Sequence, residues 1–338
     1  MSLLNVVGTV SLAFALLPRP AAGGLDAAAA TTHEASDDSK ENRDKAKGGK
    51  KATGAPKEGA SADCRIEGPS AALRDLPEAS GLAASRRSPG ILWSHLDSGA
   101  SPVLIALDTH GAVKGKVRLS GVTLTDWEDV AVSPCGASSC VYVADIGDNR
   151  GARQSIAVHR LREPLPTDSS APAAETFMGV FPDGPQDAEA FFVLGTGDMF
   201  VVTKGDTGGP VALYRFPSNA KAGGAASTLQ KVGVLQSGRI SKENWVTGAS
   251  ASTDGRWVVL RTPGSLTFYD AGRIAKGDFG SPLKFSVAAM KEPQGEGVAF
   301  GANGAVFLAG EGGGKKAAGT FGSLVCNLPA SAAPSSPR

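Results

Sequence analysis

The stretch that decides the fold is residues 128–145, EDVAVSPCGASSCVYVAD. It contains two apolar runs, residues 128–133 and 141–145, separated by a segment that carries Pro, Gly and Ser. Each run has the length and the valine content of a β-strand, and the segment between them has turn residues. The stretch therefore predicts a β-hairpin, and its antiparallel pairing brings the acidic residues Glu128 and Asp145 to the same end.

Similar hairpins recur along the chain, five in all, at a period of about fifty residues. The first strands of these units start at Ser80, Glu128, Glu189, Gly248 and Glu296. The second strands end at His95, Asp145, Lys204, Arg261 and Glu311. A third strand follows in each unit and a fourth in the first four, which is typical of propeller blades. We predict an all-β five-bladed β-propeller; six blades are the alternative, because the long second and third units have room for another hairpin.

The fifth unit has no fourth strand, whereas a short strand at residues 64–66 precedes the first unit. We expect this N-terminal strand to complete the last blade and close the ring. Closure would place Cys64 beside Cys326 and leave Cys135 and Cys140 to pair across a short turn, so two disulfides are expected. Reduced thiols are the alternative. A zinc site is disfavoured, because the C-x4-C spacing has no second ligand pair.

The ends of the chain differ in composition from the repeats. An apolar run from Leu3 to Leu17 predicts a signal peptide over residues 1–24. Residues 25–61 are rich in Ala, Gly and mixed charges and predict a disordered linker, as does the Ser/Pro/Ala composition for the tail at 329–338. The propeller domain is expected at 62–328. We expect a monomer that is secreted, periplasmic or on the cell surface, with no transmembrane segment in the mature chain.

Charge excludes one class of partner. The formal net charge is +1, and the globular part has no dense stripe of Lys and Arg, so no nucleic-acid partner is expected. The polar strand ends predict instead a ring of charged side chains at one mouth of the channel.

Oxygen ligands dominate this predicted ring. Its carboxylates are the expected metal ligands: Glu128, Asp145, Glu189, Glu296 and Glu311. Such ligands suit a hard cation, Ca²⁺ before Mg²⁺, because Ca²⁺ accepts irregular oxygen coordination. The alternative is that these acids only accept hydrogen bonds from loop amides.

Other ring residues suggest ligand binding or catalysis. Two cations, Lys204 and Arg261, would attract phosphate or carboxylate groups beside a bound metal. With Glu128 and Glu296 as candidate bases, they form the predicted catalytic set. The candidate ligand-binding residues are His95, Asp148, Asn149 and Arg150.

Several stretches resemble a family of secreted bacterial β-propeller proteins of largely unknown function. They begin at Ser80, His95, Asp126, Asp145, Asp187 and Gln294, in the forms SGLAAS, HLDSG, DWEDVA, DIGDNR, DAEA and QGEGVA. The resemblance spans residues 62–328 and extends more distantly to phytase-like and esterase-like propellers. In the phytase-like group, mouth carboxylates hold Ca²⁺ and basic residues receive phosphate. The chain departs from the family at Leu96, where Asn is usual, and at Gly248, which leaves a gap in the ring.

Three functions fit these patterns. The first is a calcium-binding propeller that holds or hydrolyses a small anionic ester, through a metal-bound water. The second is a noncatalytic module that binds a protein or cell-surface partner. The third is cleavage of glycosides by two carboxylates, which requires an open cleft between them.

Overall fold

The computed structural model describes residues 60–330, apart from residues 98, 100, 174, 207, 315 and 316. The predicted signal peptide, nearly all of the predicted linker and most of the predicted tail lie outside the described residues. Ser61, which was expected in the linker, forms a β-bridge with Lys284. Among the described residues, no helix has the length and apolar character needed to cross a membrane.

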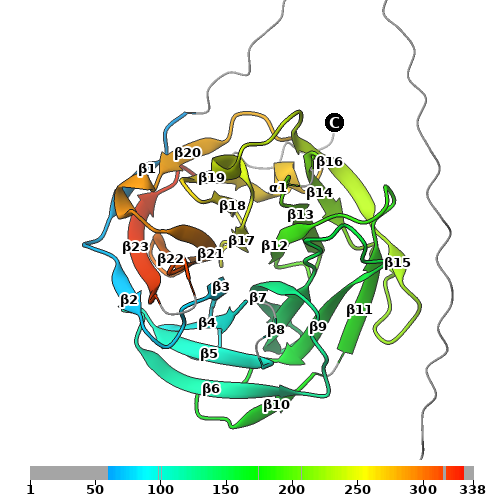
Figure 1. Ribbon diagram of the computed structural model, residues 1–338, viewed down its shortest axis with the longest axis horizontal. Helices are drawn as coiled ribbons and strands as arrows, with labels where there is room; N and C mark the ends of the chain where they lie inside the picture. The colour runs from blue at the N-terminus through cyan, green and yellow to red at the C-terminus, as the bar shows by residue number, and fades with distance from the viewer. Residues whose placement is uncertain are drawn as a thin grey trace, which may run out of the picture. The chain divides into compact units, whose positions relative to one another are not determined.

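Five sheets stand around a common axis as the blades of a propeller (Figure 1), so the predicted five-bladed fold is confirmed. Each blade has four main strands, of which β3, β7, β12, β17 and β21 are the innermost. Blade 1 contains β3 (Ala79–Ala84), β4 (Ile91–Leu96), β5 (Val103–Asp108) and β6 (Val113–Ser120). Blade 2 contains β7 (Trp127–Cys135), β8 (Ser138–Asp145), β9 (Ile156–Arg162) and β11 (Glu175–Val180). Blade 3 contains β12 (Ala188–Val193), β13 (Met199–Thr203), β14 (Val211–Arg215) and β16 (Gln230–Gln236).

The last two blades follow the same plan. Blade 4 contains β17 (Gly248–Ala251), β18 (Trp257–Thr262), β19 (Ser265–Asp270) and β20 (Leu283–Ser286). Blade 5 contains β21 (Gln294–Phe300), β22 (Ala305–Glu311), β23 (Gly319–Asn327) and β1 (Asp63–Ile66). Short extra strands are β2 (Ala71–Leu73), β10 (Ser170–Pro172) and β15 (Ser227–Thr228). The helical turns are η1 (Lys242–Asn244), α1 (Ala271–Ile274) and η2 (Ala288–Met290).

The N-terminal strand closes the ring as expected. β1 pairs antiparallel with β23, and the register places Cys64 opposite Cys326. These two cysteines form a disulfide, and Cys135 and Cys140 form another across the β7–β8 turn. The two disulfides indicate an oxidising environment outside the cytoplasm. The contact between β1 and β23 is the seam that closes the ring. β2, which was not expected, extends this seam by pairing with the first part of β23.

Apolar side chains fill the spaces between neighbouring blades. Five clusters of buried residues correspond to the five blade-to-blade contacts. In blade 1, for example, Trp93 packs toward blade 2, whereas Leu92 packs toward blade 5. Successive residues of a strand point to opposite faces, so each blade contributes to two clusters. This packing fixes the inner strands around the channel.

Candidate metal site at the channel mouth

Three glutamates enter the channel from the inner strands of blades 2, 3 and 5. The registers of β7, β12 and β21 with the adjacent second strands each shift at one of these residues. They are Glu128, Glu189 and Glu296, and all three are buried. A β-bulge of this kind breaks the alternation of a strand and redirects the unpaired side chain. The bulges therefore explain how strand-start carboxylates come to face one another across the axis.

Glu128 lies in a tight cluster with two aspartates from neighbouring loops. Asp97 follows β4 and Asp126 precedes β7, and one carboxylate oxygen from each residue lies within 4.8 Å of the others. Calcium binds oxygen at about 2.3–2.6 Å, so two of its ligands are at most about 5 Å apart. The three carboxylates are close enough to share one ion.

The loop after β8 passes directly over this cluster at Gly147. A Cβ atom on Gly147 would lie 2.3 Å from Oε1 of Glu128 and 2.7 Å from Oδ2 of Asp126. The Gly147 N–H donates to the Asp126 carbonyl at 3.0 Å, and the Asn149 side-chain amide donates to Asp126 Oδ2 at 3.4 Å. Any larger residue at position 147 would displace the carboxylates.

Crowding of these acids raises their pKa values. Burial raises the pKa of Glu128 well above its ordinary value, and the charges of Glu189 and Asp97 add to the effect. Burial, with a smaller contribution from Glu311, raises the pKa of Glu296 to about 8. The pKa of Glu311 rises to about 7, mainly through burial and then through the charge of Asp97. A bound cation would relieve this repulsion.

Lys204 contacts the acids in the half of the mouth formed by blade 3. Its ammonium forms a close ion pair with Glu189 and lies 3.8 Å from a carboxylate oxygen of both Asp187 and Asp206. Burial alone would lower the pKa of Lys204, but the three carboxylates outweigh it and raise the pKa above its usual range. Lys204 is therefore charged and paired with carboxylates.

Arg261 lies behind the mouth, between blades 4 and 5. The residue is fully buried, and its guanidinium donates to the carbonyls of Gly297 and Ala309 at 2.6 and 2.8 Å. It also pairs with Glu292 at 2.5 Å. A Cβ atom on Gly295 would lie 2.3 Å from this guanidinium, so the glycine provides its space. Arg261 joins two blades, and we leave it out of the candidate site.

The gap in the ring at Gly248 also has a steric cause. A Cβ atom there would lie 2.5 Å from the carbonyl oxygen of Glu296, in the bulge of the next inner strand. β17 pairs with β18 without a register shift, and Gly248 stands opposite Arg261. The bulge of blade 5 therefore occupies the space that a side chain at position 248 of blade 4 would need.

His95, expected at the ring, lies in the apolar contact between blades 1 and 2. Its ring is fully buried and stacks on Trp127 with the centroids 4.1 Å apart. Nδ1 donates to the carbonyl of Leu96 at 2.9 Å, and burial lowers the pKa of His95 to about 4. The imidazole is neutral at physiological pH and belongs to the packing between the blades.

Asp145 supports the mouth from the end of β8. Its carboxylate accepts the backbone N–H groups of Thr125 and Asp126 at 3.1 and 2.8 Å. It also pairs with Arg153 at 2.8 Å. These contacts fix the loop that carries Asp126, so Asp145 positions a member of the cluster.

The loop that follows contains the remaining predicted ligand-binding residues. Asp148 is buried and accepts the backbone N–H groups of Ala152 and Arg153 at 3.0 and 2.7 Å. Asn149 and Arg150 are exposed at the tip of the loop. Asp148 shapes the loop, while Asn149 reaches the cluster through Asp126.

Asp129 blocks the channel immediately behind the acidic mouth. It is fully buried, and its carboxylate accepts backbone N–H bonds from Val130 at 2.9 Å, Phe191 at 2.9 Å and Ala249 at 3.1 Å. A further backbone bond comes from Leu82. The donors belong to the inner strands of blades 1 to 4. Asp129 therefore joins four inner strands directly beside the glutamates of the mouth.

Sequence patterns did not predict the aspartates of the mouth, namely Asp97, Asp126, Asp187 and Asp206. Two of them stand two residues before an inner glutamate, in the pairs Asp126/Glu128 and Asp187/Glu189. Gln294 has the same place before Glu296, and its side chain bonds to that carboxyl. This repeated spacing was the available signal. The strand pattern alone does not show that the preceding loop residue also faces the axis, so it did not predict these aspartates.

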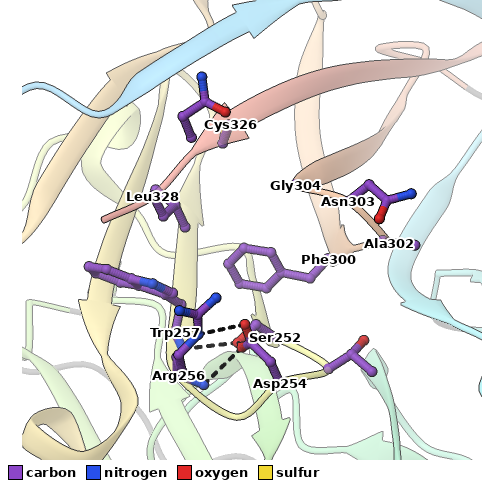
Figure 2. Close-up of a pocket in the computed structure, with 13 residues that line it drawn as sticks. Ser252, Asp254, Arg256, Trp257, Phe300, Ala302, Asn303, Gly304, Cys326 and Leu328 are labelled. Carbon is purple, nitrogen blue, oxygen red and sulfur yellow. Dashed lines mark hydrogen bonds and ion pairs between the residues drawn. The ribbon is translucent and has the colours of Figure 1, made fainter. Parts of the chain in front are cut away.

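Hollows are also present on the opposite face of the propeller. One of about 340 Å³ lies between blades 4 and 5. Figure 2 shows Phe300 projecting toward Trp257 in this hollow, with Ser252, Asp254 and Arg256 at its edge. These three polar side chains bond to one another or to the local backbone. Because the polar groups at this edge already have partners, we assign it no function.

Comparisons with known proteins show similarity of fold. No family model and no curated protein matches the chain. A PQQ-bound aldose sugar dehydrogenase from Streptomyces coelicolor is 12% identical, covers 81% of this chain and 100% of its own, and has a TM-score of 0.49. A gluconolactonase from Xanthomonas campestris is 12% identical, with 80% and 99% coverage and a TM-score of 0.41. A virginiamycin B lyase from Staphylococcus aureus is 9% identical, with 78% and 99% coverage and a TM-score of 0.39. The chain thus has distant structural similarity to β-propeller enzymes, without assignment to a family.

Proposed function

We propose that this protein binds one divalent cation at Asp97, Asp126 and Glu128 in the channel mouth. The supporting observation is the convergence of three carboxylate oxygens within 4.8 Å of one another, one of them on a buried residue. Burial of an acidic cluster is costly unless a positive charge is present. Lys204 lies nearest to a different set of acids, and a divalent ion would neutralise part of the like charge that converges in this cluster.

Calcium is the cation that suits these groups best. The ligands are carboxylates, and the side-chain amide of Asn149 in the loop above them donates to one of them, Asp126. Calcium accepts six to eight oxygen ligands in irregular geometry, whereas magnesium requires a near-octahedral arrangement. We expect calcium to bind more tightly than magnesium.

Isothermal titration calorimetry on the chelator-treated protein tests this proposal. We expect saturable binding of one calcium ion, lost in Asp97→Asn and in Glu128→Gln. Glu67→Gln is the matched control, because Glu67 pairs with Arg65 beside the outermost strand of blade 5. Absence of calcium binding to the folded wild-type protein would refute the metal site.

Hydrolysis of a small anionic ester is a second candidate function. It is favoured by Glu296 and Glu311, whose pKa values of about 8 and 7 suit proton transfer near neutral pH. When bound, the ion would supply a polarised water and an attachment point for the anionic group. Glu296 would accept a proton, and Lys204 would help to set the charge balance of the mouth.

Turnover of chromogenic phosphate and carboxylate esters, with and without chelator, tests the hydrolase. We expect activity that requires calcium and falls at least a hundredfold in Glu296→Gln. Calcium binding without turnover of any ester would favour the noncatalytic alternative, a module for a protein or cell-surface partner.

We also infer that the chain is exported and acts as a monomer. The two disulfides support export, because such bonds persist in oxidising compartments. Fractionation of a bacterial host that expresses the full chain, with light scattering of the recovered protein, tests both points. Reduced cysteines in a cytoplasmic product would contradict export.

A further inference from the structure

We propose that a hollow between blades 5 and 1, on the face opposite the acidic mouth, binds a small molecule with an apolar body and one carboxylate group. Neither the proposed metal ion nor the proposed hydrolysis takes part in this binding. The inference therefore does not depend on the proposed function.

The hollow has the size and the lining of a site for a small molecule. Its volume is about 480 Å³, and ligand sites generally measure about 300–1,000 Å³ and have mostly apolar walls. The first hairpin of blade 1 forms one wall, and the first hairpin of blade 5 forms the other. The largest apolar side chains of the lining are Pro89, Ile91, Leu92 and Phe307.

Arg86 alone is charged among the described residues that line this hollow. It is exposed, and its guanidinium has no bonded partner among the residues that the structure describes. The next residue, Arg87, differs, because its guanidinium donates to the carbonyl of Glu163 at 2.8 Å. A positive charge that is free to bind an anion thus lies at the edge of an apolar hollow.

The backbone that carries Arg86 is held by a buried carboxylate of blade 2. Glu163 is fully buried, and its carboxylate accepts the backbone N–H groups of Arg86 and Arg87 at 3.3 and 3.2 Å. It also accepts the hydroxyl of Ser85 in a close bond and the indole N–H of Trp93 at 3.0 Å. Because these bonds already fix the turn, little conformational freedom is lost there when a ligand binds.

The lining also indicates the chemical class of the ligand. One guanidinium can donate two parallel N–H bonds to a carboxylate, whose single charge it balances. A phosphate group carries about two negative charges near neutral pH, so one guanidinium would not balance it. The apolar walls would remove a hydrocarbon body from water. An alkyl carboxylate is therefore the ligand that this hollow suits best.

Titration calorimetry with decanoate, on the full chain in chelator, tests this inference. We expect one saturable site in the wild type, and at least tenfold weaker binding in Arg86→Gln, because the charge-assisted bonds are lost. Arg239→Gln is the matched control, since Arg239 is also exposed and lies outside the lining. Its affinity for decanoate should equal that of the wild type.

A second variant tests the apolar part of the hollow. Ala302 is an exposed lining residue in the turn between β21 and β22. We expect Ala302→Trp to fill the hollow and lower the affinity for decanoate at least tenfold. Ala137→Trp is its control, because Ala137 is exposed in the corresponding turn of blade 2 and does not line the hollow.

Decanol separates recognition of the carboxylate from adsorption to an apolar surface. We expect decanol to bind at least tenfold more weakly than decanoate, since it has no charge to pair with Arg86. Absence of saturable decanoate binding to the wild type would overturn the inference, as would equal affinity for the two compounds or an unchanged affinity in Arg86→Gln. Because chelator is present throughout, failure of the proposed metal site would leave these results unchanged.

Discussion

The side chain of Asp129 alone bonds to four blades. Its carboxylate accepts N–H groups from inner strands that are far apart in sequence, including Phe191 and Ala249. Each buried donor that loses its acceptor costs about 1–3 kcal/mol. We therefore expect Asp129→Asn, which turns an N–H group toward these donors, to lower the free energy of unfolding by about 3 kcal/mol or more.

Urea denaturation of the purified variant measures this loss. Asp254→Asn is the control, because Asp254 accepts hydrogen bonds in an exposed turn and should cost less than about 1 kcal/mol. Equal losses in the two variants would show that Asp129 has no special part in joining the blades.

Glu296 makes stability depend on pH. Its pKa is about 8 in the folded protein, compared with an ordinary value of 4.5, mainly because of burial. Between these pH values the folded chain holds a proton that the unfolded chain has lost, so the free energy of unfolding falls as pH rises. The shift corresponds to a loss of about 5 kcal/mol across this range in the absence of metal.

Urea denaturation in chelator at several pH values between 4.5 and about 8, the ordinary and the raised pKa of Glu296, tests the direction. We expect stability to decrease with pH in the wild type and in Glu67→Gln, and the slope to be smaller in Glu296→Gln. An increase of stability with pH would contradict the raised pKa.

The sequence predicted the position of a residue where the repeat determines that position. It did not predict the position where packing against a neighbouring blade determines it. The alignment of the repeats brought Glu128, Glu189 and Glu296 together, as the structure does. Arg261 occupies the equivalent strand end in blade 4, but Gly295 leaves a space into which it turns. The absence of a side chain in a neighbouring strand is not visible in a repeat pattern, so its burial could not be predicted.

At the level of elements, the inner strands of blades 2, 3 and 5 each have a bulge at the glutamate near the strand start. Hairpin spacing predicted the strands, because alternation and turn residues are local signals. The bulges and the path of the preceding loops depend on contacts between blades, so Asp97, Asp126 and Asp187 were missed. The site therefore combines residues from strand ends, which could be predicted, with residues from loops, which could not.

The loop over the cluster offers a test of this element. Gly147→Ala would place a methyl group 2.3 Å from the Glu128 carboxylate. Because the carboxylates would have to move, we expect calcium affinity to fall at least tenfold, while the blades keep their packing. Titration calorimetry measures the affinity.

Gly195→Ala is the control for this loop, since a Cβ atom at Gly195 would meet nothing within 4 Å. Unchanged affinity in Gly147→Ala would show that the loop does not constrain the ligands.

For the whole molecule, the ring is held by five blade contacts and one seam. The N-terminal strand at residues 64–66 and the cysteine positions predicted this seam, because a fifth blade without a fourth strand requires another strand to complete it. β2 was not predicted, since three residues with one buried side chain carry little sequence signal.

The two disulfides should contribute unequally to stability. Cys64 and Cys326 are 262 residues apart, whereas Cys135 and Cys140 are 5 apart. Loop-closure entropy predicts losses of about 5 and about 2 kcal/mol, respectively, when each pair is replaced by serine.

Urea denaturation of the two double-serine variants measures the difference. The Cys135/Cys140 variant serves as the control for loss of a disulfide without opening the ring. Similar losses in both variants would show that ring closure contributes little.

The seam also determines how mechanical force passes through the protein. Cys64 and Cys326 lie near the two ends of the described residues and are joined by a covalent bond. A pull applied between the preceding and following segments would pass through this bond and leave the blades between the cysteines unloaded. Stretching in an optical trap should therefore show no unfolding step of the propeller until the disulfide is reduced, after which the blades should extend.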